Sequence, residues 1–270
     1  MKNEDYFIIS GKKRVVIKEI SKYETPTVQE IRSIMKLLPE YHPYKASLGL
    51  ILIQGLRPAE VSGLNWNNFV FDTEKKEIIS MNHLIYKPRN TKHYRSTTHL
   101  YKKIEKPFYS KWLSDQLIGY KERYPALEHN KVFPFSNSDV FNAIFKRLRK
   151  KYGKKLPFLL DKVSYTIEGD PYRCRHRIHA YALRHFSFTY HYWNTFNQDV
   201  LALTRAFGHS RPETAFKHYI FPKQTIGLDK SYSNIDDFLA FVPKDQITLP
   251  GFKKELIFDE NQKSLSDFIY

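Results

Sequence analysis

The sequence has little of what marks membrane, secreted or disulfide-stabilised proteins. Its 270 residues include one cysteine, Cys174, which excludes an intramolecular disulfide and favours a reducing interior. No apolar run approaches the ~18 residues that a membrane-spanning helix needs, and the longest candidate, ASLGLILIQGL at 46–56, is typical of a buried helix. The N-terminus lacks the apolar core and cleavage site of a signal peptide. These absences predict a protein without membrane association, located in the cytoplasm.

Acidic residues are also scarce relative to basic ones. The chain has 44 Lys and Arg against 28 Asp and Glu, a net charge of +16. Residues 220–270 contain six lysines and eight acidic residues, a balance of −2, so residues 1–219 carry +18. An excess of this size favours a polyanionic partner, most often nucleic acid. The alternative is a solvated surface that only keeps the protein in solution.

Apolar residues are abundant, at 41% of the chain with 16% aromatic, so a sizeable core is expected. The first helix should follow Thr27, because Thr27 and Glu30 form a capping box ahead of apolar residues at helical spacing. Pro58 and Pro212 are typical first residues of helices, and Gly208 is a typical stop. Helices are predicted at 27–38, 46–56, from 58, 109–124, 138–151, 179–195, 198–207 and 212–219.

Short β-rich segments lie between the third and fourth of these helices. NFVFD, KEIISM and HLIYK are predicted as three strands separated by polar turns, and RNTKHYRSTTHLY as a cationic hairpin tip with its return strand. A further small hairpin is predicted within residues 156–177. The fold class is therefore α+β, mainly α-helical, with a small antiparallel sheet.

Three segments contain side chains suited to phosphate chemistry. In GLRPAEVSGLNW, Glu60 lies one helical turn after Arg57 and can hold its guanidinium with one edge free for a phosphate. The alternative is an ordinary ion pair at a helix start. In IHAYALRHFSFTY, Tyr181 lies one turn before Arg184, and the alternative is a basic amphipathic helix. In FGHSRPETAFKHY, His209 and Tyr219 lie on neighbouring helices and can converge on one site.

Taken in order, these segments closely resemble the catalytic domain of tyrosine recombinases, the phage integrase family, over residues 27–221. The resemblance implies a short basic N-terminal arm at 1–26, a catalytic domain at 27–221 and a C-terminal tail at 222–270 that docks on a neighbouring protomer. It also implies a site-specific recombinase or integrase of a mobile genetic element. Such an enzyme binds double-stranded DNA as a dimer or tetramer, associated with the nucleoid, and needs no metal or other cofactor.

The resemblance also implies a role for each matching residue. Tyr219 would attack a DNA phosphodiester and form a 3′-phosphotyrosyl bond. Arg57 and Arg184 would grip the non-bridging oxygens, and His209 would add a hydrogen bond to the same phosphate. Glu60 and His185 would support these residues from behind.

A lysine of the cationic hairpin would protonate the leaving 5′-oxygen. Lys92, near the expected tip, is the first choice and Lys87 the alternative, because the family pattern does not align cleanly here. Either lysine could instead contact only the phosphate backbone.

Two features depart from the family pattern. The family usually has histidine where this chain has Tyr181, and a phenol with a pKa near ~10 is a poor base at neutral pH. Tyr181 is therefore expected to position the phosphate or the nucleophile by hydrogen bonding, as in similar archaeal-type integrases, with His179 as a weaker substitute. Most members also carry a helical core-binding domain before the catalytic one, whereas 26 residues precede it here. The chain is thus expected to be a minimal recombinase or the catalytic portion of a split one.

Two other functions share these residues. A type IB topoisomerase-like enzyme would nick and close DNA without bringing two sites together. A protein descended from a recombinase would bind DNA with weak or no catalysis, an alternative that Tyr181 favours and that the two arginines, His209 and Tyr219 oppose.

Overall fold

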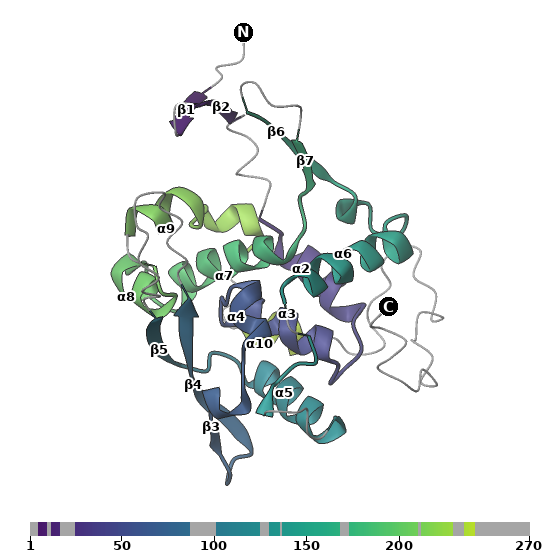
Figure 1. The fold of residues 1–270 in the computed structure, drawn as a ribbon, viewed down its shortest axis with the longest axis vertical. Coiled ribbons are helices and arrows are strands. Elements are labelled where there is room, and N and C mark those ends of the chain that lie inside the picture. Colours follow the sequence, from purple (N-terminus) through teal and green to yellow (C-terminus); the bar gives the residue numbers. More distant parts are fainter. Residues whose placement is uncertain are drawn as a thin grey trace, which may run out of the picture.

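A computed structural model describes residues 5–9, 12–16, 25–86, 101–124, 130–135, 137–167, 173–209, 212–228 and 235–240. Most of this part is a helical body with a small sheet against one side, and a second sheet lies beyond the body (Figure 1). The helices are α2 (Val28–Lys36), α3 (Pro43–Ile53), α4 (Pro58–Ser62), α5 (Lys111–Arg123), α6 (Asp139–Tyr152), α7 (Ala180–Asn194), α8 (Val200–Ala206), α9 (Pro212–His218) and α10 (Ile235–Ala240). The mainly helical α+β class predicted from the sequence is confirmed.

Helices α3 and α7 form the centre of the body and pack against each other. Ten of the eleven residues of α3 are buried, as expected for a helix with apolar residues on every side. Helix α5 covers α3, while α8 and α9 pack together near the C-terminal half of α7. A second group of buried aromatics, which includes Phe188, Phe207 and Tyr219, fills the space among α7, α8 and α9.

Local sequence sets the starts of these helices. The predicted capping box of α2 is present, since Glu30 N–H donates to Thr27 Oγ1 at 3.3 Å and Thr27 N–H donates to Glu30 Oε2 at 2.8 Å. Pro58 and Pro212 occupy first helical positions, and Gly208, with φ of 71°, follows the end of α8. Helix α3 begins at Pro43, three residues before the prediction, because His42 Nδ1 accepts from Tyr44 N–H and caps it.

The sheet of the body has three antiparallel strands, β3 (Phe69–Asp72), β4 (Glu77–Tyr86) and β5 (Tyr101–Pro107), in the order β3-β4-β5. The prediction of separate strands at KEIISM and HLIYK was wrong, because residues 77–81 and 83–86 lie in one strand, β4. Asn82, the polar residue between them, pairs with Glu105 of β5, so continuous cross-strand bonding carries the strand through. The cationic hairpin tip lies outside the described residues.

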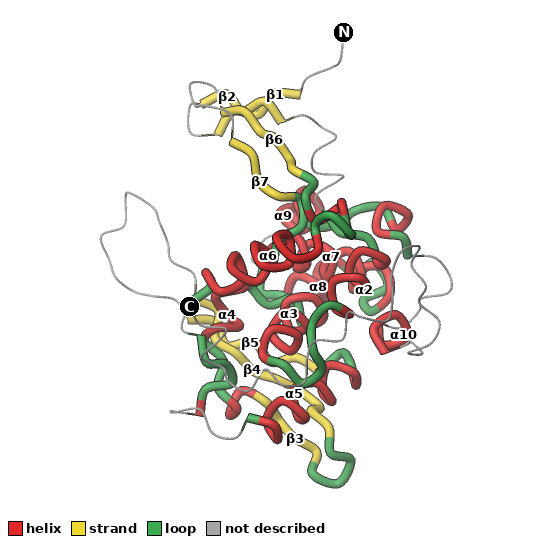
Figure 2. Tube along the Cα trace, turned by 90° about the vertical axis from the view of Figure 1, so that its right-hand side faces the viewer, coloured by secondary structure: helices red, strands yellow, loops and turns green. Residues whose placement is uncertain are grey.

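A four-stranded sheet, in the order β1-β2-β6-β7, joins the N-terminal segment to the middle of the chain. It contains β1 (Asp5–Ile9), β2 (Lys12–Val16), β6 (Lys162–Ile167) and β7 (Arg173–His176), all antiparallel. The predicted hairpin within residues 156–177 is therefore present. Figure 2 shows this sheet beyond the helices rather than among them. Within the predicted N-terminal arm, β1 pairs with β2, and β2 extends the sheet of β6 and β7.

Part of the predicted C-terminal tail packs on its own chain. Helix α10 contacts α2 and α5, and Asp236 accepts hydrogen bonds from the Ser110 hydroxyl and from Lys111 N–H at the start of α5. Residues 229–234 and 241–270 of that tail lie outside the described part. Within the described residues, no helix is both long and apolar enough to span a membrane.

Candidate active site

The turn between α3 and α4 carries Arg57 and depends on one glycine. Gly55 has a φ of +60°, and a Cβ atom there would lie 1.8 Å from the Phe207 ring. A side chain at this position would meet both a left-handed backbone and a clash. Phe207 directly precedes Gly208 and His209, so the close approach brings two segments 152 residues apart in sequence into contact. We call residues 54–57 the α3–α4 turn.

Arg57 is held from the first turn of α4 by Glu60. The Arg57 guanidinium donates to Glu60 Oε1 at 2.5 Å, and Arg57 N–H donates to Glu60 Oε2 at 2.7 Å. The Arg57 side chain is 25% exposed and that of Glu60 is 6% exposed. Burial lowers the pKa of Arg57, but the Glu60 carboxylate outweighs it and the net shift is upward. Arg57 is therefore anchored and charged, and part of it still reaches solvent.

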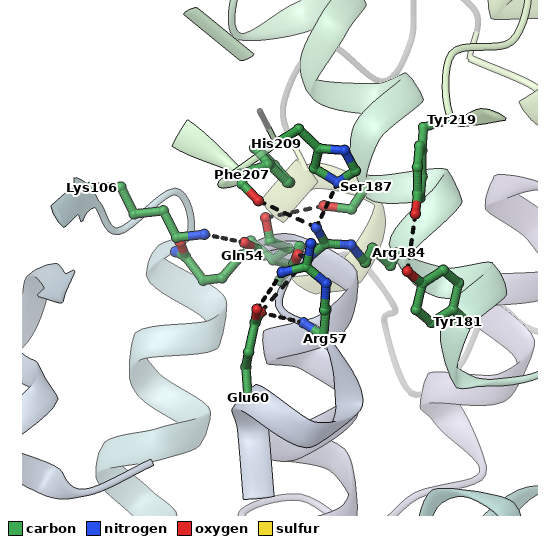
Figure 3. Close-up of polar contacts among 12 residues, drawn as sticks. Gln54, Arg57, Glu60, Lys106, Tyr181, Arg184, Ser187, Phe207, His209 and Tyr219 are labelled. Carbon is green, nitrogen blue, oxygen red and sulfur yellow. Dashed lines mark hydrogen bonds and ion pairs between the residues drawn. The ribbon is translucent and has the colours of Figure 1, made fainter. Parts of the chain in front are cut away.

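Arg184, on the second turn of α7, is the largest side chain in the described part of the chain that is fully buried, at 1% exposure. Its Nη1 donates to the Gly55 carbonyl and lies 3.9 Å from Glu60 Oε2. Its Nη2 is 3.3 Å from the Phe207 carbonyl and 3.0 Å from His209 Nε2 (Figure 3). Its Nε has no hydrogen-bond partner within the described residues. One arginine thus joins the α3–α4 turn to the Gly208–His209 turn and keeps a buried donor unused.

Arg184 and Arg57 are like charges at close quarters. Burial, and then the neighbouring Arg57, lower the pKa of Arg184, while Glu60 opposes both effects. Glu60 lies against both guanidinium groups, so one carboxylate serves two cations. Two guanidinium groups against one carboxylate leave the cluster with a net positive charge, which favours the binding of an anion.

Tyr219 lies on the other side of the site, just after α9. Its hydroxyl is 2.9 Å from the hydroxyl of Tyr181, and its carbonyl accepts from Thr189 Oγ1 at 2.8 Å. The rings of His185 and His209 lie 4.8 and 4.9 Å from the Tyr219 ring, each edge to face. Tyr219 is 8% exposed and Tyr181 37% exposed. The nucleophile predicted from sequence is therefore enclosed by aromatic rings, with an exposed tyrosine at its hydroxyl.

The surroundings of Tyr219 favour its neutral form. Burial, and then Tyr181, raise the pKa of the Tyr219 phenol, while Arg184 and Arg57 act in the opposite direction. Both arginines are thus close enough to lower the pKa of the phenol by their charge. An anion formed there, or a phosphate bonded to it, would lie in the field of two guanidinium groups.

The structure brings together seven of the residues predicted for the site: Arg57, Glu60, Tyr181, Arg184, His185, His209 and Tyr219. Lys92 and its alternative Lys87 lie outside the described residues. His179 is the N-cap of α7, where its Nδ1 accepts from Ala182 N–H at 2.8 Å. His179 therefore stabilises the start of α7.

Sequence reasoning missed Lys106 of β5 and Gln54 at the end of α3. Lys106 is 3% exposed, and its Nζ donates to the Gln54 carbonyl beside the α3–α4 turn. A signal was present, because Lys106 shares a strand face with Ile104 at period two, and a lysine on a buried face needs a reason. Across the described ranges, no three His, Cys, Asp or Glu side chains are grouped as a metal ion would require.

Residues 25–225 match the model of the phage integrase family. A structure of the Tn1549 transposon integrase with circular intermediate DNA is similar at 20% identity and a TM-score of 0.47, over 74% of this chain and 62% of that one. The XerH site-specific recombinase, in a post-cleavage complex with a palindromic difH substrate, is similar at 16% identity and a TM-score of 0.45. That match covers 74% of this chain and 50% of the other, so the chain spans between half and two thirds of these solved chains. The search of curated proteins found no match.

Proposed function

Because the chain belongs to the phage integrase family, we propose that it cleaves and rejoins double-stranded DNA at specific sites through a covalent bond to Tyr219. The observation that carries this proposal is the convergence of two guanidinium groups, an imidazole and a phenol on one spot. Cations that share a single carboxylate, with a buried donor still unused, suit a phosphodiester of the DNA backbone.

In the proposed reaction, Tyr219 Oη attacks the phosphorus and the bond from phosphorus to the 5′-oxygen breaks. The products are a 3′-phosphotyrosyl bond and a 5′-hydroxyl, and the reverse attack by a 5′-hydroxyl restores the DNA. The covalent bond conserves the energy of the broken phosphodiester, so rejoining requires no nucleotide.

The arginines would bind the two non-bridging oxygens, whose charge grows in the pentacoordinate transition state. Arg57 offers the edge that Glu60 does not hold, and Arg184 offers the Nε proton. His209 Nε2 accepts from Arg184 Nη2 at 3.0 Å, which leaves Nδ1 of a neutral imidazole as the group that would donate to one of the same oxygens. Because backbone carbonyls fix the orientation of Arg184 without DNA, its guanidinium would not have to turn when the phosphate arrives.

Two protons have to move in this reaction. The phenolic proton of Tyr219 would pass through the Tyr181 hydroxyl, at 2.9 Å, to solvent, which Tyr181 reaches at 37% exposure. The leaving 5′-oxygen would take a proton from a hairpin lysine, Lys92 or Lys87. Tyr181 thus orients the nucleophile and relays its proton without having to be a strong base.

Recombination joins ends from two DNA sites, so we expect a dimer or tetramer on DNA within the nucleoid. The net charge of +18 on residues 1–219 supports binding to the DNA backbone. Residues 27–221 would act as the catalytic domain, with 1–26 and 222–270 as arm and tail.

The test uses nicked duplexes built from the ends of the chain's own genetic element, in which the nick lets a short fragment escape and traps the covalent adduct. Wild-type protein should form a protein–DNA adduct that survives denaturation, and Tyr219→Phe should form none. Tyr192→Phe is the matched control, because Tyr192 is also 8% exposed and belongs to the same aromatic group, and it should form the adduct.

If wild-type protein binds these duplexes but yields no adduct, the chain is a silent DNA-binding protein. Adduct formation by Tyr219→Phe at the wild-type level would reject the nucleophile. Relaxation of supercoiled DNA without joining of two sites would favour the topoisomerase-like alternative.

A further inference from the structure

Lys106 is a buried cation that the proposed reaction does not use. It lies on the inner face of β5 at 3% exposure, paired across the sheet with Met81 of β4. Its Nζ donates to the Gln54 carbonyl and lies 4.9 Å from the centre of the Phe207 ring. Within the described residues it forms no ion pair with a carboxylate. The lysine therefore meets a backbone carbonyl and an aromatic face.

The carbonyl that Lys106 binds is one of three successive carbonyls held by side chains at the end of α3. The Ile53 carbonyl meets His191 Nε2 at 2.7 Å, and the Gly55 carbonyl accepts from Arg184 Nη1. Lys106 takes the Gln54 carbonyl between them. Carbonyls at a helix C-terminus carry partial negative charge and attract cations. The α3–α4 turn is thus held by Lys106 and Arg184, basic side chains from different elements, at the carbonyls three and two residues before Arg57.

The charge at Lys106 is unfavourable for the fold. Burial, and then the neighbouring Arg184, lower the pKa of Lys106 to about 7, while Glu60 acts in the opposite direction. His191, also buried beside it, has its pKa lowered to about 3 by burial and by Lys106, despite its bond to the Ile53 carbonyl. A buried ammonium without a carboxylate is costly, and an apolar residue would suit this strand face better. Stability alone does not account for a lysine here.

We propose that Lys106 is a positioning residue for the phosphate clamp, which holds the α3–α4 turn so that Arg57 and Arg184 face the same phosphate. The inference rests on the proposed function and deepens it. Lys106 and Arg184 bind adjacent carbonyls, so movement of Lys106 shifts the turn that carries one arginine and anchors the other.

Lys106 is distinct from the proton donor of the reaction. Its Nζ is directed at the Gln54 carbonyl, and in Figure 3 it and the Tyr181–Tyr219 pair lie on opposite sides of the two guanidinium groups. A residue behind the clamp can orient the arginines without reaching the 5′-oxygen.

The test compares wild type with Lys106→Met, Lys106→Arg and the control Lys45→Met. Lys45 is a buried lysine as well, at 4% exposure, but it pairs with Glu40 at the far end of α3. Each protein is measured for DNA affinity and for the rate of adduct formation at saturating protein. Lys106→Met should lower that rate by about 10–100-fold, as small misplacements of reacting groups do, with affinity within about twofold of wild type.

Lys106→Arg should recover part of the lost rate, because it restores a buried donor and charge, and Lys45→Met should cleave like wild type. Melting curves establish that each variant is folded. Where Lys106→Met does not fold, Lys106→Gln takes its place, since it keeps a donor for the Gln54 carbonyl while removing the charge.

A second substrate carries sulfur in place of the bridging 5′-oxygen, because a thiolate leaves without a proton. With this substrate, Lys106→Met should still form the adduct about 10–100-fold more slowly than wild type. Restoration of the wild-type rate would overturn the positioning role and make Lys106 the proton donor. An undiminished rate with the ordinary substrate would overturn the proposal too. Absence of any adduct with wild-type protein would instead remove the proposed function, and this inference with it.

Discussion

On the cationic side of the site, Arg184 and Lys106 donate to backbone carbonyls and are 1% and 3% exposed. On the nucleophile side, the Tyr219 hydroxyl is hydrogen-bonded to that of Tyr181, which is 37% exposed. The first side is fixed by bonds to backbone carbonyls at the end of α3, whereas the second is held by side chains, through the hydrogen bond to Tyr181 and the rings packed around Tyr219. In the proposed reaction, charge stabilisation would come from groups bonded to the backbone, and side-chain contacts would position the attacking phenol.

Among the substitutions on the cationic side, removal of Arg184 should reduce adduct formation most. Arg184→Ala should reduce adduct formation by about 10²–10³-fold, the cost of losing an oxyanion donor, while DNA binding, which depends on many surface cations, is largely kept. Arg184→Lys should remain strongly impaired, because an ammonium cannot reach Gly55, Phe207 and His209 together.

Arg177→Ala is the control for this series, since Arg177 pairs with Glu30 and Asp161 away from the site. Suicide-substrate cleavage and gel-shift affinity are measured side by side. Equal loss of cleavage and binding in Arg184→Ala would give Arg184 a structural role instead.

Gly55→Ala tests the scaffold without removing any charged group. The added methyl would lie 1.8 Å from Phe207, so the α3–α4 turn or the Gly208–His209 turn must move. We expect a loss of about 2–4 kcal/mol in the free energy of unfolding, from overpacking and backbone strain together, and a lower cleavage rate in the folded fraction.

Gly227→Ala isolates the strain, because Gly227 has a similar φ of +69° but nothing within 4 Å of its Cβ position. Gly227→Ala should lower the free energy of unfolding by about 1 kcal/mol. Chemical denaturation measures both losses. Equal losses in the free energy of unfolding would show that the clash with Phe207 adds nothing to the effect of Gly55→Ala.

Substitution of Tyr181 probes the nucleophile side with smaller effects. Tyr181→Phe removes the hydrogen bond to Tyr219 and should slow adduct formation about threefold to tenfold, the worth of one hydrogen bond. Tyr181→His should maintain or raise the rate at pH 7–8 and lose it below about pH 6.5, where an imidazole takes up a proton. Rates of adduct formation measured from pH 5.5 to 9 show whether activity falls at acidic pH. Complete loss of activity in Tyr181→His would mean that the phenol has a role that a histidine cannot take.

The burial of Lys106 should also show in the pH dependence of stability. The pKa of Lys106 is lowered to about 7 from its ordinary 10.5, so between these values the unfolded chain binds the proton more readily than the folded one. Wild type should therefore gain stability relative to Lys106→Met as the pH rises from 7 to 10, by up to ~1 kcal/mol per pH unit, whereas below pH 7 the difference is constant.

Urea unfolding at a series of pH values measures this difference, with Lys103→Met, an exposed lysine of the same strand, as the control for loss of a positive charge. A difference between wild type and Lys106→Met that does not change with pH would mean that the ammonium is not desolvated by burial.

Much of the fold could be predicted because its signals are local. The capping box at Thr27 and Glu30, the prolines at helix starts and the glycine after α8 each act within one helical turn. Failures occurred where bonding partners are distant in sequence. Asn82 looked like a break between strands, but its pairing with β5 carries β4 through it. His179 looked like a substitute base, yet its bond to Ala182 N–H caps α7.

By itself, the sequence determined the kinds of side chain available, since arginine, histidine and tyrosine with an excess of positive charge suit a phosphate substrate. The order of these residues also gave the family, which the match over residues 25–225 shows. Tertiary structure alone decided which groups meet. Gly55 contacts Phe207, which is 152 residues later in the chain, Tyr181 faces Tyr219, and Lys106 binds Gln54. Packing between distant elements sets these distances, and no local pattern encodes them.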